Sequence, residues 1–249
     1  MRTTWCYVLA SVTVVSLASL LGILTISVSR ERLTRMIFFM VSLAVGAMFG
    51  DTFIHLLPES FGRGRPSLAT SVYVLAGIFT FFLLEKFLLW RHEHVPQEAN
   101  TIHPVGYMNL VADGLHNIID GLLIGASYLV SIPVGLGTTL AVLLHEIPQE
   151  IGDFGILLHA GFTKGRALWL NFLSATLAIV GAIISLLVGA QFRDFSAVVL
   201  PLTAGGFIYI AGSDLVPELH KERQPAKSAI QLLAIGIGVG LMLVLTALD

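Results

Sequence analysis

The sequence predicts an all-α membrane protein with eight transmembrane helices. Hydrophobic residues make up 55% of the 249 residues and charged residues only 12%, whereas soluble domains carry about 25% charged residues. The mean hydropathy is correspondingly high, at +0.86. Apolar runs of about 20 residues, the length that spans a bilayer, recur along the chain. These observations exclude a soluble globular domain.

Eight apolar runs are long enough to cross a bilayer. We expect helices at about 5–28, 33–57, 70–90, 105–130, 133–159, 166–190, 197–217 and 228–248. The first run follows Arg2 and could be mistaken for a signal peptide. It is long and has no clear small-residue cleavage site, so we interpret it as a retained helix.

The short loops between these runs indicate one transmembrane domain over residues 1–249. The longest polar stretch, 91–104, joins the third and fourth helices, and three helices follow Lys164. This gives a 3+2+3 arrangement. Because three is odd, the second triplet would insert upside down, which predicts an inverted repeat. No repeat is visible at the level of single residues.

The distribution of Lys and Arg predicts the orientation. With eight helices, the loops opposite the termini hold ten of the 14 basic residues, namely Arg30, Arg32, Arg35, Lys86, Arg91, Lys164, Arg166, Lys221, Arg223 and Lys227. Both termini are therefore expected outside the cytoplasm, in a bacterial-type plasma (inner) membrane. The chain has no basic patch suited to nucleic acid. Its single cysteine, Cys6, excludes a disulfide framework.

Ionisable residues interrupt two of the apolar runs. In the fourth helix, Asp113, His116, Asn117 and Asp120 share one helical face. In the fifth, His145, Gln149 and Asp153 follow one track, and Glu146 and Glu150 follow the track beside it. A charge at membrane depth costs roughly 2.5–3.5 kcal/mol and usually marks a transport path. The alternative is a structural hydrogen-bond network, which would not need two carboxylates together with two imidazoles.

Pro148 strengthens the hypothesis of an ion site. Proline has no N–H, so the carbonyl of Leu144 loses its helical partner beside His145 and Glu146. Broken helices commonly build ion sites in transporters, although a packing kink would explain the proline equally well. Imidazole combined with carboxylate and amide oxygens suits Zn²⁺, Fe²⁺, Mn²⁺ or Cd²⁺. The sequence therefore predicts a divalent metal ion as transported substrate, with no organic cofactor.

The motifs HN-x-x-DG, beginning at His116, and HE-x-PQE-x-GDF, beginning at His145, resemble those of the ZIP (ZRT/IRT-like) metal transporters. The match is to the subfamily with HE-x-P-x-E-x-GDF in its fifth helix. The resemblance implies import of divalent metal, chiefly zinc, into the cytoplasm through a binuclear site between helices four and five. It also implies a homodimer. Iron, manganese and cadmium remain alternative substrates.

The resemblance also implies the metal ligands. His116, Asp120, His145 and Gln149 would form one site. Asn117, Asp120, Glu146 and Gln149 would form the adjacent one, with Asp120 bridging. Many relatives place His or Glu where this chain has Gln149. Glutamine is neutral and a poorer ligand, so this departure weakens the prediction of two tightly held ions.

Five further residues are candidates for additional path or metal positions: Asp51, His55, Asp113, Glu150 and Asp153. A helix-end network explains Asp51 and His55 equally well. The loop at 91–103 contains three histidines, which would either collect metal or belong to a solvated linker.

Three other functions are compatible with parts of the sequence. An intramembrane zinc protease would need HExxH, but Gln149 stands at the second histidine position, so we expect no enzyme. A membrane metal sensor lacks support because the sequence has no sizeable soluble domain. An exporter of another family is not excluded by composition, and only the family resemblance predicts import.

Overall fold

A computed structural model describes residues 2–23, 28–62, 67–92, 104–189, 191 and 195–247. Over these ranges the chain is almost entirely helical, which confirms the predicted all-α class. Most of the predicted 91–104 loop, including two of its three histidines, lies outside the described residues.

The described helices form eight rods. In chain order they are α1 (Arg2–Ala18) with η1 (Ser19–Ile23), α3 (Arg30–Gly50) with η2 (Asp51–Leu56) and α4 (Leu57–Gly62), α5 (Ser67–His92), α6 (Pro104–Val130), α7 (Ile132–His159), α8 (Lys164–Ala175) with α9 (Leu177–Gly189), α10 (Phe195–Tyr209) with η3 (Ile210–Leu215) and α11 (Val216–Leu219), and α12 (Pro225–Thr246). Five rods, those that begin with α1, α3, α8, α10 and α12, contain segments long and apolar enough to cross a bilayer. The chain is thus an integral membrane protein.

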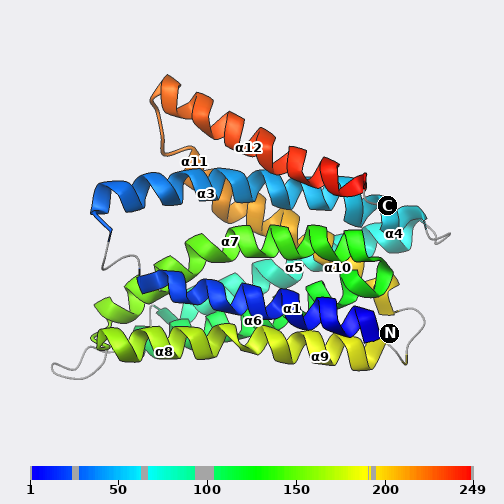
Figure 1. Cartoon of the computed structure of the whole chain (residues 1–249), viewed down its shortest axis with the longest axis horizontal. Helices are drawn as coiled ribbons and strands as arrows, with labels where there is room; N and C mark the ends of the chain where they lie inside the picture. Colours follow the sequence, from blue (N-terminus) through cyan, green and yellow to red (C-terminus); the bar gives the residue numbers. More distant parts are fainter. Residues whose placement is uncertain are drawn as a thin grey trace.

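The rods pack as two groups (Figure 1). In the first, which we call the α6 bundle, α6 packs on α7 and on α8–α9, and α1 packs on α7 and α9. In the second, the α3 bundle, α3 pairs with α12 and α5 pairs with α10. The bundles meet mainly where α3 contacts α7 and where α10 contacts α6. Helices far apart in sequence are therefore neighbours in both groups.

Glycine allows the close approach of α6 and α9. A side-chain carbon at Gly121 would lie 2.7 Å from the carbonyl carbon of Ala178 and 2.9 Å from the amide nitrogen of Ala182. Gly181 faces α6 in the same way, 2.9 Å from the carbonyl carbon of Ile118. Such small residues let membrane helices pack backbone to backbone.

The predicted break at Pro148 is wrong, because α7 continues as one helix from Ile132 to His159. The helix distortions lie in two other rods. Both η2 and η3 are π-helical turns, and a proline follows each two residues later, at Pro58 and Pro217. A wider turn relieves the clash that a proline ring makes with the preceding turn. Pro148 is accommodated without one.

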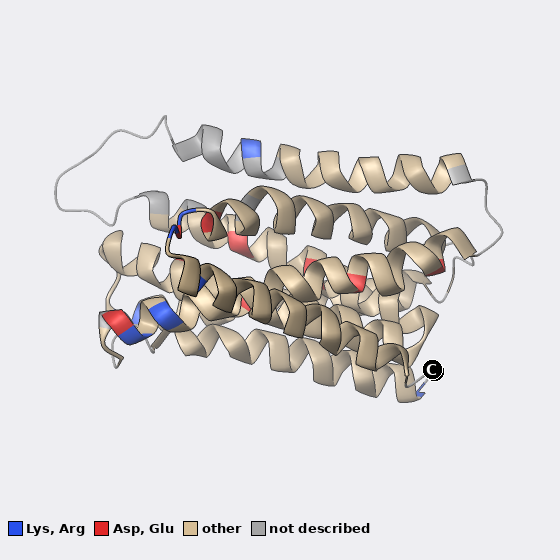
Figure 2. Ribbon diagram, turned by 90° about the horizontal axis from the view of Figure 1, so that it is seen from above, with Lys and Arg blue, Asp and Glu red and all other residues tan. Residues whose placement is uncertain are grey.

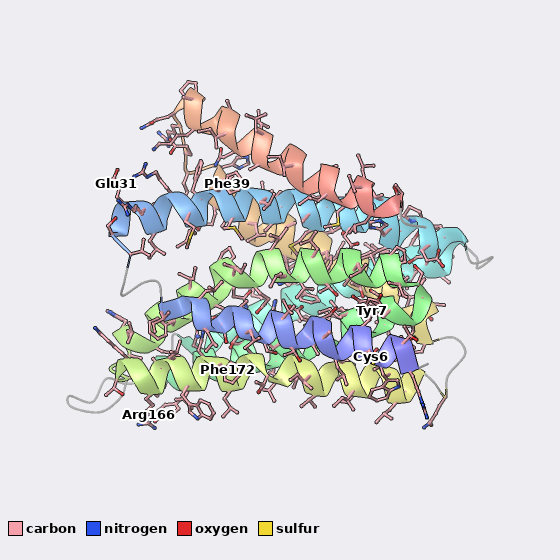
Figure 3. The ribbon with its side chains drawn as sticks, viewed as in Figure 1. Cys6, Tyr7, Glu31, Phe39, Arg166 and Phe172 are labelled. Atoms are coloured by element: carbon pink, nitrogen blue, oxygen red, sulfur yellow. The ribbon has the colours of Figure 1, made fainter. Side chains whose placement is uncertain are left out.

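The two ends of the molecule differ in charge. Both chain termini lie at one end, and the starts of α3, α8 and α12 lie at the other (Figure 1). Glu31 and Arg166 mark this second end, whereas Cys6 and Tyr7 lie toward the first (Figure 3). Most Lys and Arg residues gather near the second end, while acidic residues occur along the middle of helices (Figure 2). We call this second end, with segments 30–35, 160–166 and 219–227, the basic end.

Candidate metal centre

Four predicted side chains meet between α6 and α7. His116 and Asp120 stand one turn apart on α6, and His145 and Glu146 are adjacent on α7. The Nε2 atom of His145 lies 3.3 Å from Asp120 Oδ2 and 3.4 Å from Glu146 Oε1. The Nε2 atom of His116 lies 3.5 Å from the same Glu146 oxygen and 3.7 Å from Asp120 Oδ2. One ligand atom from each residue thus lies within 4.8 Å of every other.

The backbone fixes the tautomer of His145. Its Nδ1 atom lies 3.1 Å from the carbonyl oxygen of Ala141, one turn earlier on α7. A carbonyl can only accept, so Nδ1 carries the hydrogen. In the neutral ring, Nε2 then presents a lone pair toward Asp120 and Glu146. Orientation of a ligating imidazole by such a bond is typical of metal sites.

The carboxylates in this group have no other partners. Both oxygens of Asp120 and both of Glu146 are buried without a hydrogen-bond partner among the described residues. The two Nε2 atoms face each other at 3.4 Å. Two carboxylates and two imidazoles this close together could neutralise a divalent cation and offer it four ligand atoms. Removing such groups from water without a partner would be costly.

Aromatic rings of the α3 bundle close the group on one side. Phe81 of α5 meets the His116 ring edge-on at 6.2 Å between centroids, and Phe207 of α10 meets His145 at 6.3 Å. Asp120, Glu146 and His145 are buried, whereas His116 keeps partial exposure. The site therefore lies where the two bundles meet.

The other two predicted ligands, Asn117 and Gln149, have different surroundings. Asn117 is fully buried and turns its amide Nδ2 to Asp113, 2.8 Å from Oδ1, while its own Oδ1 has no described partner. Gln149 lines a cavity beside His145 and Pro148. Metal coordination by these two amides stays a prediction.

A second acidic group lies beside the first. Carboxylate oxygens of Asp113, Glu146 and Glu150 come within 4.8 Å of one another, and all three residues are buried. Asp153, one turn beyond Glu150, accepts a hydrogen bond of 3.1 Å from Asn109. Carboxylates therefore follow one another along the α6–α7 seam toward the basic end.

Asp51 and His55 form a separate polar group, away from the four-residue site. His55 Nδ1 lies 3.0 Å from Asp51 Oδ1, and Thr138 of α7 donates to Asp51 Oδ2 at 2.9 Å. Thr138 also lies 3.0 Å from the hydroxyl of Ser127 on α6. The group joins the α3 bundle to the α6 bundle. It is a buried hydrogen-bond network, and the predicted path role of Asp51 and His55 stays a prediction.

A cavity of about 690 Å³ reaches the four-residue site from the side of the basic end. Its lining includes His145 and Gln149 from the middle of α7, Thr34 at the start of α3 and Glu218 of α11. The cavity thus extends from His145, one of the four site residues, toward the basic end.

Several neighbours of these polar groups were not predicted from the sequence. Asn109 lies four residues before Asp113, so extending the polar face of α6 by one turn would have found it. Phe81, Phe207 and Thr138 come from distant segments, and nothing in their local pattern marks them as neighbours of the histidines or of Asp51.

The chain was compared with known proteins. It matches the family model described as "ZIP Zinc transporter" over residues 2–104 and 89–246. The chain belongs to this family. The resemblance drawn from the two motifs is thereby confirmed. Because the family consists of transporters, the chain is not an enzyme, as the missing second histidine of HExxH predicts.

Individual relatives also have names that describe them as zinc transporters. Zinc transporter ZIP13 of Pongo abelii is 39% identical over 217 residues, covering 82% of this chain and 65% of that protein. Zinc transporter ZIP13 of Homo sapiens is 34% identical over 255 residues, covering 82% and 69%. Zinc transporter SLC39A7 of Rattus norvegicus is 29% identical over 342 residues, covering 99% and 73%. The chain thus spans between 65% and 73% of the length of these three relatives.

Proposed function

We propose that the chain carries divalent transition metal ions, zinc foremost, across the membrane into the cytoplasm through His116, Asp120, His145 and Glu146. The observation that carries this proposal is the convergence, at one buried point, of two imidazoles and two carboxylates that have no hydrogen-bond partner among the described residues. Zinc accepts this nitrogen–oxygen ligand set readily. Relatives named as zinc transporters support the choice of metal. Iron, manganese and cadmium fit the same donors less specifically.

Asn117 and Gln149 would complete the coordination with their amide oxygens. Asn117 stands next to His116 on α6, and Gln149 is one turn beyond His145 on α7. A second ion bridged by Asp120 would need both, and neither amide adds charge to hold it.

Import is supported by access and charge together. The cavity connects His145 with the basic end. Basic residues favour the cytoplasmic side of a membrane. The structure would then represent a state open to the cytoplasm, with both termini outside. The predicted bacterial-type plasma membrane stays a prediction, since the relatives named above come from animals.

Packing supports the proposed 3+2+3 inverted repeat. If rods one to three match rods six to eight, the pair α3–α12 corresponds to α10–α5, and α6–α9 corresponds to α7–α1. All four pairs are in contact. The two π-helical turns, each followed by a proline, also occupy equivalent rods. A homodimer remains a prediction, which light scattering of the purified protein would test.

Uptake of radioactive zinc into proteoliposomes tests the function. His116→Ala should abolish saturable uptake, because the site loses one of two nitrogen ligands. His159→Ala is the matched control, since His159 is exposed at the end of α7 and should leave uptake unchanged. Iron, manganese and cadmium as competitors would rank selectivity. Equal uptake by the two variants would overturn the proposal.

Cys6 offers a test of orientation because it is the single cysteine and is exposed. A membrane-impermeant maleimide applied to intact cells should label it if the termini lie outside. In a Cys6→Ser background, Arg223→Cys at the basic end should stay unlabelled until the cells are opened. The reverse pattern would place the termini in the cytoplasm and contradict the proposed orientation.

A further inference from the structure

We propose that Asp113, Glu146 and Glu150 form a second cation site, built from oxygen ligands alone, beside the four-residue site on the side of the basic end. It deepens the proposed function, on which it rests, by giving the ion a second position on its route. Its ligand class is a hard divalent cation, for which manganese is a suitable probe.

The position follows from helix geometry. Glu150 lies one turn after Glu146 on α7, which is about 6 Å along the helix axis. Asp113 lies seven residues before Asp120 on α6, about 10 Å along the axis. Since α6 begins and α7 ends at the basic end, both displacements point the same way. Glu146 belongs to both groups and would be a ligand of the ion at both positions.

The orientation of the carboxylates supports ligation. Asn117 donates to one oxygen of Asp113, at 2.8 Å, and Asn171 of α8 donates to one oxygen of Glu150. The remaining oxygens, Asp113 Oδ2 and Glu150 Oε1, are buried without a hydrogen-bond partner among the described residues. Each carboxylate is therefore fixed through one oxygen and offers the other. Ligating carboxylates are commonly held by such neighbouring donors.

The two amides provide an independent indication of a cation. Asn117 and Asn171 are both 0% exposed. The side-chain carbonyl oxygen of each is buried and has no described hydrogen-bond partner. An amide oxygen is a neutral cation ligand, so each asparagine offers one further oxygen beside the carboxylates. Together the group offers carboxylate and carbonyl oxygens, the set that suits manganese, magnesium and calcium.

The negative charge of the three carboxylates also favours a bound cation. Among the described residues, no lysine or arginine forms an ion pair with Asp113, Glu146 or Glu150; the recorded ion pairs of Glu146 are with histidines. Three carboxylates buried together repel one another unless a cation or protons neutralise them. A divalent ion would cancel most of this charge.

Manganese binding to the purified full chain in detergent tests the proposal. The signal of free Mn²⁺ in electron paramagnetic resonance falls as the ion binds, which gives the number of sites and their affinity. The double variant Asp113→Asn/Glu150→Gln keeps side-chain shape and removes two charges. It should lose one bound manganese, or bind it at least tenfold more weakly, while zinc affinity at the four-residue site changes by less than threefold.

Two controls separate this inference from the proposed function. His116→Ala/His145→Ala should lose tight zinc binding but keep the oxygen-site manganese. Asp51→Asn removes a buried carboxylate from the inter-bundle network and should keep both ions. If the wild type binds no zinc, the proposed function fails, and the manganese result is judged separately. Unchanged manganese binding in a folded Asp113→Asn/Glu150→Gln protein would show that the carboxylates carry protons, which overturns the inference.

A milder variant guards against misfolding. Glu150→Asp keeps the charge and withdraws the carboxylate by one methylene. It should weaken manganese binding at least threefold, and wild-type affinity in this variant would equally overturn the site.

Discussion

Replacing Gly121 by alanine should force α6 away from α9. The added carbon would lie 2.7 Å from the carbonyl carbon of Ala178, whereas ordinary contact begins at 3.4 Å. The neighbour is helix backbone, which cannot rotate aside as a side chain would. The carbonyl oxygen of Ala178 would lie nearer still, so the helices must separate by more than about 1 Å to restore normal van der Waals distance.

The change in the free energy of unfolding caused by Gly121→Ala is the sum of two opposing effects. Overpacking of this kind costs about 1–3 kcal/mol. Alanine returns about 1 kcal/mol through its better helix propensity. Gly155→Ala on α7 is the matched control, because a carbon there meets nothing within 4 Å and gains the propensity alone. The difference between the two variants should thus equal the overpacking cost, or roughly 3–10 °C in melting temperature for a chain of this size.

Thermal unfolding in detergent, followed by circular dichroism, measures this difference. Zinc uptake should fall as well in Gly121→Ala, because His116 and Asp120 lie on the same helix and sites tolerate shifts of only about 0.5 Å. Gly155→Ala should transport as the wild type does. Equal melting temperatures for the two variants would refute the close packing of α6 on α9.

Three other predictions concern the polar groups. Thr138→Val leaves Asp51 Oδ2 without its 2.9 Å donor and should lower the free energy of unfolding by about 1–3 kcal/mol. The control Thr80→Val loses only an exposed hydrogen bond to its own helix and should change the melting temperature little. Similar losses of stability in the two variants would contradict the inter-bundle role of Thr138. Gln149→His adds an imidazole one turn from His145 and should raise zinc affinity in chelator competition. Unchanged affinity would place residue 149 outside the site. Zinc affinity of the wild type should fall as the pH is lowered from 7.5 to 5.5, because protons compete for imidazole and carboxylate; a flat profile in the same competition assay would exclude histidine ligands.

The sequence predicts the helices well because bilayer crossing is a local property. Apolar runs and their polar loops are visible without tertiary information. The helix distortions differ from the prediction at the prolines. Pro148 sits within a continuous α7, whereas Pro58 and Pro217 follow π-helical turns. Whether a proline breaks, widens or merely interrupts hydrogen bonding depends on packing around it, which the sequence does not encode locally.

Site residues on one helix face could be predicted, but their grouping could not. His116 with Asp120 and His145 with Glu146 are close in sequence, so only the contact of α6 with α7 was needed to join them. Asn117 instead faces Asp113, although its spacing suits the metal group equally well. Asp51 belongs with Thr138 because the α3 bundle meets α7 at that level. Such pairings depend on rotamers and on which bundles touch.

X-ray absorption at the zinc edge tests the central claim most directly. In zinc-loaded wild-type protein, the account predicts two imidazole nitrogens at about 2.0–2.1 Å together with carboxylate oxygens at similar distance. The imidazole scattering should be lost in His116→Ala/His145→Ala. A wild-type spectrum of oxygen ligands alone would contradict the account, because zinc would then rest outside the histidine site.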